Sequence, residues 1–290
     1  MNKDWAEKFR ETKQLLKKNT FPDGIKALSE LRSSLFEEML SWREALTKEE
    51  FSAQPFPNAD GYHSKTVAYS LWHIFRIEDI VVNTLIKDEE QVFFAGNYQT
   101  RMNAPSVTTG NELEGEQIAG FSEKLDINVL YEYIAAVKKS TDEWLSKAEY
   151  ADLKTKFGDA DKERIKRLGV VSESEKASWL IDYWCGKDIQ GLMLMPMSRH
   201  WIMHVEAADR IIAKLRKDCR PCACCGCLTV REKHDICPVC GWEDDRVQNA
   251  DPSFAGGANG VNLETARKNY KKFGASEEKF LMKKRNGEKK

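Results

Sequence analysis

Apolar residues recur with a helical period through most of residues 1–215. The pattern is clear between Lys26 and Leu46, where leucines 28, 31, 35 and 40 return every three to five positions. A stretch that contains two prolines, residues 54–58, ends this region. Few segments show the two-residue alternation of a half-buried strand. The sequence therefore predicts a body built of helices.

The same periodicity predicts further helices. Ser64 is a suitable N-cap for a long helix that reaches about Lys87. The other predicted helices span residues 127–147, 173–183 and 189–216. A polar loop rich in Asn, Gly and Thr fills about residues 96–115. Four long helices with apolar stripes favour a mainly α fold, an up-and-down four-helix bundle.

The helical pattern stops at residues 218–221, which we interpret as a domain boundary. A short helix is predicted beyond it over residues 262–273, capped by Asn262 and closed by Gly274. We therefore expect a helical bundle over 20–216, a small cysteine-rich module over 219–275 and a disordered basic tail over 276–290.

Composition limits the function classes. The 290 residues are 31% charged and 41% hydrophobic, with a net charge of −1, so no general attraction to nucleic acid or anionic membranes is expected. The longest apolar run, around residues 191–197, is too short to span a bilayer. The N-terminus is charged throughout and shows no signal peptide, which favours a cytoplasmic protein with reduced thiols.

Four cysteines form the most specific motif of the chain. They are two C-x-x-C pairs, each followed by a glycine: Cys222 with Cys225, and Cys237 with Cys240. Zinc prefers four soft ligands at the corners of a tetrahedron, and two such turns supply them. In a reduced compartment, clustered cysteines favour a metal over the alternatives, a disulfide or a redox pair. We predict a structural zinc that the module needs to fold.

Other residues compete as ligands in this module. Cys224 lies inside the first pair, Cys227 follows it, and Cys219 precedes it. His234 lacks a second ligand at knuckle spacing and is interpreted as a loop residue.

Three histidines fall on predicted bundle helices. His200 and His204 are four residues apart, so they share one helix face, and His73 lies on the earlier long helix. The face of the pair also carries apolar residues, namely Met193, Met197, Ala208, Ile211 and Leu215. Buried imidazoles cost free energy unless they are satisfied, either by a shared metal ion or by backbone and serine partners. Trp201 follows His200, so the His-Glu-x-x-His pattern of zinc proteases is not supported.

Two segments carry a family resemblance. Residues 70–79, SLWHIFRIED, and residues 198–208, SRHWIMHVEAA, resemble the two histidine-bearing helices of the DinB-like superfamily. The resemblance implies a four-helix bundle in which His73, His200 and His204 bind one divalent metal, zinc or nickel. Several members are thiol-dependent S-transferases, and many have no assigned activity.

The C-terminal module resembles the cysteine-rich CPCC domain in three blocks, residues 222–226, 235–245 and 259–275. Ala223 replaces the usual proline, and Cys227 stands where an aromatic residue is common. The resemblance implies the zinc site and little about function.

Two function classes follow. The first is a metal-dependent enzyme, in which an ion with open positions activates a small thiol or a water for transfer to an electrophile or for hydrolysis. In it Tyr183, Trp184 and Trp201 are candidate pocket residues, although core positions are the alternative. Cys185 is interpreted as a buried, inert thiol, with a nucleophile as the alternative. Glu78 and Asp79 are expected on a solvated face, and the alternative is that they orient a metal ligand.

The second class is a scaffold that binds a protein partner, with both metals structural. Residues 219–251 carry six acidic and four basic side chains, which disfavours binding of nucleic acid. The basic run 267–272 would favour such binding. The sequence leaves a homodimer open.

Overall fold

The structure is a computed structural model that describes residues 2–281, and they are mainly helical. The chain divides into two compact units, one of residues 1–41 and 48–211 and one of residues 42–47 and 212–290. Within the described residues, no helix is long and apolar enough to cross a membrane.

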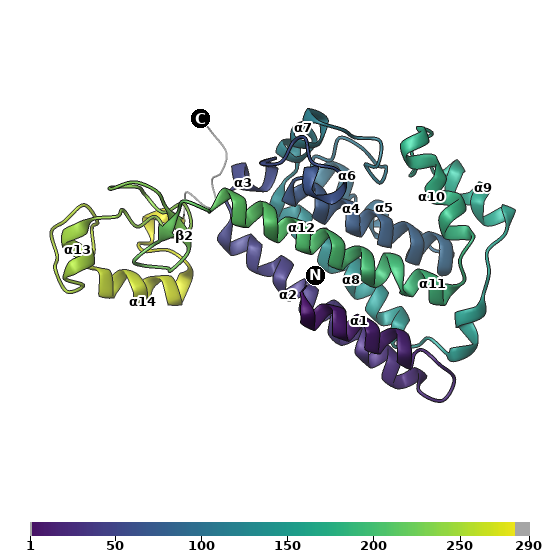
Figure 1. Cartoon of the computed structure of the whole chain (residues 1–290). Helices are drawn as coiled ribbons and strands as arrows, with labels where there is room; N and C mark the ends of the chain where they lie inside the picture. The colour runs from purple at the N-terminus through teal and green to yellow at the C-terminus, as the bar shows by residue number, and fades with distance from the viewer. Residues whose placement is uncertain (1, 282–290) are drawn as a thin grey trace. The chain divides into compact units, whose positions relative to one another are not determined.

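The helical body contains four long helical segments. They are α2 (Phe21–Ala45), α4 (Val67–Asp79) with its π-helical extension η2 (Ile80–Ile86), α8 (Ile127–Leu145), and α11 (Ile189–Met193) continued by the π-helix η4 (Met195–Arg199) and α12 (His200–Leu215). They run alongside one another (Figure 1), and Arg32 of α2 contacts all the other three.

Shorter elements complete the body. They are α1 (Lys3–Leu15), α3 (Lys48–Ser52), η1 (Gly61–Ser64), α5 (Val92–Ala95), α6 (Tyr98–Arg101), α7 (Glu116–Lys124), η3 (Tyr150–Lys154), α9 (Asp159–Arg167) and α10 (Glu175–Cys185). Helix α1 lies along α2, where the Trp5 indole N–H donates to Ser34 Oγ over 3.1 Å.

The stripe of α2 differs from the prediction at one position. Leu28, Leu31 and Leu35 are fully buried as expected, but the stripe continues through Met39 and Trp42. Leu40 stands one residue off this stripe and is 40% exposed, so its assignment to the buried face was wrong.

The N-cap of α4 is Thr66, and the prediction of Ser64 was wrong. Thr66 Oγ1 accepts the Tyr69 backbone N–H over 3.0 Å, which satisfies one of the free amides of the first turn. Ser64 ends the preceding 3₁₀ turn, η1, and its hydroxyl donates to the Gly61 carbonyl. Residues 61–64 therefore form a separate element that lies close to the site described below.

The C-terminal unit contains little regular structure. Strand β1 (Arg220–Pro221) pairs antiparallel with β2 (Leu228–Val230), with a bulge between Arg220 and Pro221. Helices α13 (Arg246–Ala250) and α14 (Leu263–Phe273) follow. Asn262 caps α14 through its side chain, and Gly274 ends it with a φ of 77°, as predicted.

The core of this unit is built around the cysteines. Four of them, Cys222, Cys224, Cys237 and Cys240, pack with Val230, Val239, Trp242, Leu263 and Ala266. Of the expected basic tail, residues 282–290 lie outside the described residues. Ser276 is buried, and its backbone N–H donates to the Cys240 carbonyl over 2.7 Å.

Candidate metal centres

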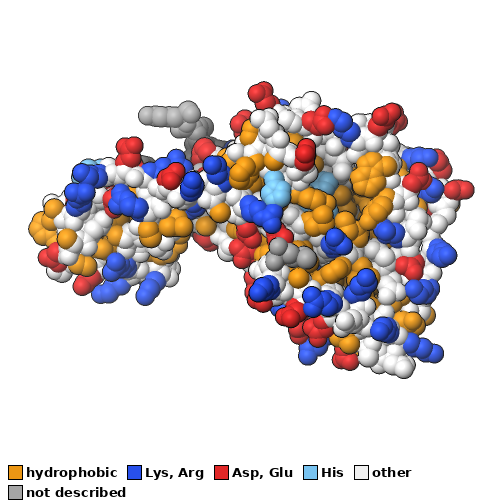
Figure 2. All heavy atoms as spheres, viewed as in Figure 1, with side chains coloured by type: hydrophobic (Ala, Val, Ile, Leu, Met, Phe, Trp, Pro, Cys, Tyr) orange, Lys and Arg blue, Asp and Glu red, His pale blue; other side chains and the backbone are white. Residues whose placement is uncertain are grey.

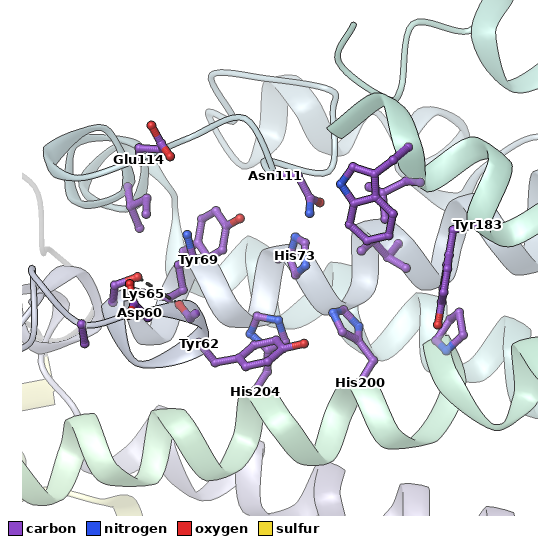
Figure 3. Close-up of a pocket in the computed structure, with 18 of the residues that line it drawn as sticks. Asp60, Tyr62, Lys65, Tyr69, His73, Asn111, Glu114, Tyr183, His200 and His204 are labelled. Atoms are coloured by element: carbon purple, nitrogen blue, oxygen red, sulfur yellow. Dashed lines mark hydrogen bonds between the residues drawn. The ribbon is translucent and has the colours of Figure 1, made fainter. Parts of the chain in front are cut away.

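The structure brings His73, His200 and His204 together inside the helical body. All three side chains are buried, and one ring nitrogen from each lies within 4.8 Å of the others. The ring centroids are 5.0 Å apart for His73 and His200, 4.9 Å for His73 and His204, and 4.7 Å for His200 and His204. Figure 3 shows the three imidazoles converging from two helices, α4 and α12.

The orientation of His73 is fixed by a loop. Its Nδ1 lies 2.7 Å from the Thr109 carbonyl oxygen, so Nδ1–H donates there and Nε2 keeps its lone pair. Tyr69 supports the same loop, because its hydroxyl donates to the Gly110 carbonyl over 2.8 Å. Gly110 has a φ of 77°, and a Cβ there would press on the Tyr69 ring at 3.0 Å, so the turn requires glycine.

The other two histidines have unsatisfied nitrogens. His200 Nδ1 and both ring nitrogens of His204 are buried and have no hydrogen-bond partner among the described residues. Buried polar atoms in this state are costly and call for a partner such as an ion. The alternative to a metal ion, in which backbone or serine groups form hydrogen bonds with the buried histidines, is therefore wrong for His204.

Burial keeps these imidazoles neutral. It lowers the pKa of His73 from 6.5 to about 4, and it lowers the pKa of His200 and His204 well below 6.5. Neutral imidazole is the form that binds a metal, since the ligand must offer a lone pair. The cluster is thus ready to act as a ligand set at neutral pH.

A π-helical segment leads directly into His200. Pro196 lies in η4, where it lacks an N–H and its ring would clash with the carbonyl of a regular helix. A π turn widens the helix at this point, and such turns recur at functional sites. Two contacts hold it: the Ser198 hydroxyl donates to the Met193 carbonyl over 2.7 Å, and Arg32 Nη1 donates to the Met197 carbonyl over 3.0 Å.

Arg32 belongs to a buried polar network behind the histidines. Its guanidinium binds both carboxylate oxygens of Glu78, at 2.9 and 2.7 Å, and lies 4.4 Å from the centre of the Trp201 ring. Thr141 of α8 donates to Glu78 as well, over 2.7 Å. The network therefore ties α2, α4, α8 and the π turn before His200 into one rigid frame.

The expected solvated face for Glu78 and Asp79 was wrong, because both side chains are fully buried. Asp79 accepts the backbone N–H groups of Val92 and Phe93, each over 2.9 Å, and the Tyr133 hydroxyl over 2.9 Å. Each acid is satisfied by partners distant in sequence, which periodicity alone does not reveal.

The histidine cluster lines a cavity of about 540 Å³. Its wall includes aromatic and apolar side chains, namely Tyr62, Tyr69, Ile77, Ile118, Trp179, Leu180, Tyr183, Trp184, Met195 and Pro196. Figure 2 shows hydrophobic side chains gathered beside histidine on this unit. Tyr183 and Trp184 thus lie on the pocket, whereas Trp201 is a fully buried core residue against Phe75, 4.7 Å between ring centroids.

Three residues of this cavity, and a fourth that contacts His73, were not expected from the sequence. Tyr62 packs edge-on against His204 with ring centroids 4.7 Å apart, Lys65 and Asn111 line the cavity, and Thr109 orients His73. They come from η1 and from the predicted polar loop. Loop residues follow no helical period in the sequence. Only their contacts with His73 and His204 in the folded structure reveal them.

The second cluster lies in the C-terminal unit. One ligand atom from each of Cys222, Cys225, Cys237 and Cys240 lies within 4.8 Å of the others. The Cys222 and Cys240 sulfurs are 3.6 Å apart, and so are those of Cys225 and Cys237. Four sulfurs about 2.3 Å from one zinc ion lie about 3.8 Å from one another, so the cluster fits that ion.

The two cysteine turns repeat one backbone pattern. Gly226 donates its N–H to the Cys222 carbonyl and Gly241 donates to the Cys237 carbonyl, over 2.9 and 2.8 Å. The glycines have φ values of 80° and 78°, in the left-handed region that glycine adopts without steric cost. Contact with the Cys222 thiol lowers the pKa of Cys237, as suits a thiolate ligand.

The competing residues do not join this group of four. Neither Cys224, which is buried, nor Cys227 and Cys219, which are partly buried, belongs to the cluster. His234 is exposed, has a φ of 65°, and approaches Glu243 Oε1 through Nδ1 at 3.2 Å. Cys185 of the body is buried, and burial raises the pKa of its thiol.

Comparison with known proteins identifies only the second region. The cysteine-rich CPCC family matches residues 220–290, which contain the four-cysteine cluster. This part of the chain is therefore a cysteine-rich CPCC domain.

The crystal structure of a conserved protein from Enterococcus faecalis is similar to this chain at 14% identity, with a TM-score of 0.46. The similarity covers 65% of this chain and 95% of that one. No curated protein matches.

Proposed function

We propose that residues 20–216 form a DinB-like four-helix bundle that works as a metal-dependent enzyme. The observation that carries the proposal is the set of unsatisfied ring nitrogens of His200 and His204, which face a third imidazole at the edge of a cavity. A purely structural cluster would have no need of a cavity beside it. The resemblance of the two histidine-bearing helices to the DinB-like superfamily supports the same reading.

The side chains have distinct roles in this proposal. His73, His200 and His204 bind a divalent ion, zinc or nickel, and the Thr109 carbonyl holds the His73 ring in place. When bound, such an ion supplies Lewis-acid chemistry, which lowers the pKa of a thiol or a water in its open positions. The aromatic wall of Tyr183 and Trp184 receives the apolar part of a substrate and limits access of bulk water.

We favour transfer of a small thiol to an electrophile, and the choice of thiol over water rests on the family resemblance alone. In the CPCC domain, we propose that Cys222, Cys225, Cys237 and Cys240 bind a structural zinc. Four thiolates leave no open position on that ion, so it has no part in the reaction.

The test compares two histidine variants in a thiol-consumption assay with the full chain. Low-molecular-weight thiols are offered with an electrophile such as monochlorobimane. His200→Ala should abolish turnover, whereas His63→Ala should retain it, because His63 lies outside the cavity and contacts Arg210. Turnover that survives His200→Ala would contradict the proposal.

A second function, a scaffold for a protein partner, has one observation in its favour. The small CPCC domain exposes large apolar side chains, among them Ile236 at 61% and Val247 at 57%. Contact surfaces are marked by contiguous apolar patches, to which these side chains would contribute. A fully metallated protein that is inert with thiols and with hydrolytic substrates would favour this function.

A further inference from the structure

The charge balance of the histidine site indicates what kind of molecule the cavity accepts. The inference rests on the proposed function, since it assumes a divalent ion on His73, His200 and His204. Three neutral imidazoles contribute no negative charge, so the double positive charge of the ion remains uncompensated by its protein ligands. A partner that enters the open positions is therefore favoured if it carries negative charge.

Lys65 adds a further positive charge to the same cavity. It lines the cavity between η1 and α4 and is half-buried, with Nζ 5.2 Å from the centre of the Tyr69 ring. Among the residues that the structure describes, no carboxylate forms an ion pair with it.

The acidic side chains of the cavity compensate the Lys65 charge only in part. Glu114 and Asp60 line the cavity but are exposed, and Glu114 forms an ion pair with Lys176. Asn111 adds a neutral polar group on the inner side. Its Oδ1 accepts the Thr109 hydroxyl over 2.8 Å, and Figure 3 shows its amide directed toward His73. The amide N–H₂ is thus a donor that faces the site.

The remaining wall is apolar and aromatic. Trp179 is 50% exposed and packs edge-on against Tyr183, with ring centroids 5.6 Å apart. Ile118, Leu180 and Trp184 continue this surface toward the histidines. A ligand that satisfies both parts of the cavity has an anionic end and a flat apolar body.

We infer that the cavity binds a small carboxylate with an aromatic or apolar body, and that Lys65 is the residue that selects the carboxylate. The carboxylate lies between Lys65 and the ion, within reach of the Asn111 amide, and the apolar body packs on Trp179 and Tyr183. Lys65 acts as a counter-charge, and no covalent step is assigned to it.

The experiment measures binding of three probes of one shape to the zinc-loaded full chain by titration calorimetry. The probes are 3-phenylpropionate, the neutral 3-phenylpropanamide and the cationic 3-phenylpropylamine. The carboxylate should bind roughly tenfold or more tightly than the amide, as expected for a hydrogen bond to a charged group, and the amine should bind most weakly. Equal binding of the carboxylate and the amide, or a preference for the amine, would overturn the inference.

Three lysine variants locate the effect. Lys65→Met should lose most of the preference for the carboxylate, whereas Lys65→Arg should keep much of it. Lys154→Met is the matched control, because Lys154 is an exposed lysine of the same unit that pairs with Asp188, and it should bind like wild type. A full preference in Lys65→Met would overturn the role of Lys65.

A measurement of metal content distinguishes failure of this inference from failure of the proposed function. Lys65→Met should retain the ion of the histidine site, since Lys65 is not one of the three clustered ligands. Wild-type protein that holds no ion there would contradict the proposed function. Wild-type protein that holds the ion and shows no preference for the carboxylate would contradict only the inference drawn from the cavity.

Discussion

The two candidate metal centres differ in charge and in access. The cysteine cluster offers four thiolates, which surround a zinc ion and give the centre a net negative charge. The histidine cluster offers three neutral imidazoles beside a cavity of about 540 Å³, which leaves an ion positively charged and reachable. The comparison teaches that ligand charge and ligand number distinguish a closed metal site from an open one within one chain.

The two centres also differ in what holds them in place. His73 and His200 are carried by helices that a buried network around Arg32 and Glu78 locks together. The cysteines lie on two turns in a unit with one short two-stranded sheet and two helices. The histidine site is therefore preorganised by its fold, whereas we propose that the fold of the CPCC domain depends on an ion bound by the four cysteines.

The largest expected effect is the loss of the cysteine site. Cys237→Ser removes a ligand of a zinc site whose binding free energy is on the order of 10 kcal/mol. We expect the C-terminal unit to unfold and become susceptible to proteolysis, while the helical body stays resistant. Limited proteolysis followed by mass spectrometry measures this, and His200→Ala serves as the control that leaves both units folded. Loss of the helical body in Cys237→Ser would show that the two centres are not independent.

The histidines make the stability of the body depend on pH when the metal is removed. Burial lowers the pKa of His73 from 6.5 to about 4, and it lowers the pKa of His200 and His204 as well. The unfolded chain therefore binds more protons below pH 6.5, so stability is full above 6.5 and falls as the pH is lowered toward 4. By pH 5 the expected loss is about 2 kcal/mol for His73, and the other two histidines act in the same direction.

Urea unfolding in chelator at pH 7 and pH 5 measures this loss. The matched control replaces the three histidines with Phe or Leu, which should flatten the dependence between these values. An equally steep dependence in the control would assign the effect to other groups.

The next prediction tests whether the buried network around Arg32 and Glu78 stabilises the helical body. Arg32→Met leaves the Glu78 carboxylate buried without its partner, which should destabilise the body by about 3–5 kcal/mol. The double variant Arg32→Met/Glu78→Met removes both charges and should recover much of this loss. Urea unfolding monitored by tryptophan fluorescence compares them. A single variant no less stable than the double one would show that the ion pair does not hold the frame.

The smallest expected effect is a difference in stability between substitutions in the two cysteine turns. Gly226→Ala and Gly241→Ala both place a side chain at positive φ, which costs about 1–2 kcal/mol. A Cβ at Gly226 meets open space, whereas one at Gly241 meets the Phe280 ring, so Gly241→Ala should be the more harmful. Thermal unfolding of the C-terminal unit measures the difference. The opposite order would mean that Phe280 does not pack on the turn.

Much of the histidine site could be predicted because its ligands lie on periodic helices. His200 and His204 share the face of Met193 and Met197, and all four are buried. The four cysteines could be predicted because the C-x-x-C-G turn is a local motif whose geometry follows from its own residues.

The rest depends on tertiary contacts that a linear pattern does not record. Thr109 lies in a loop and Lys65 directly follows a 3₁₀ turn, so only the fold shows their role. Glu78 looks like a surface residue until Arg32, 46 positions away, is placed beside it. The π turn at Pro196 could not be predicted from the sequence. A proline inside a helix indicates a break or a kink, but it does not specify which backbone geometry the chain adopts there.

The most direct test of the account is the metal content of the purified full chain, measured by mass spectrometry of the elements. The account predicts two ions for each wild-type chain and two for His63→Ala. It predicts one ion for His200→Ala, with only sulfur ligands in X-ray absorption, and one for Cys237→Ser. A wild-type chain that binds a single ion, bound only by sulfur, would contradict the claim that the three histidines form a metal centre.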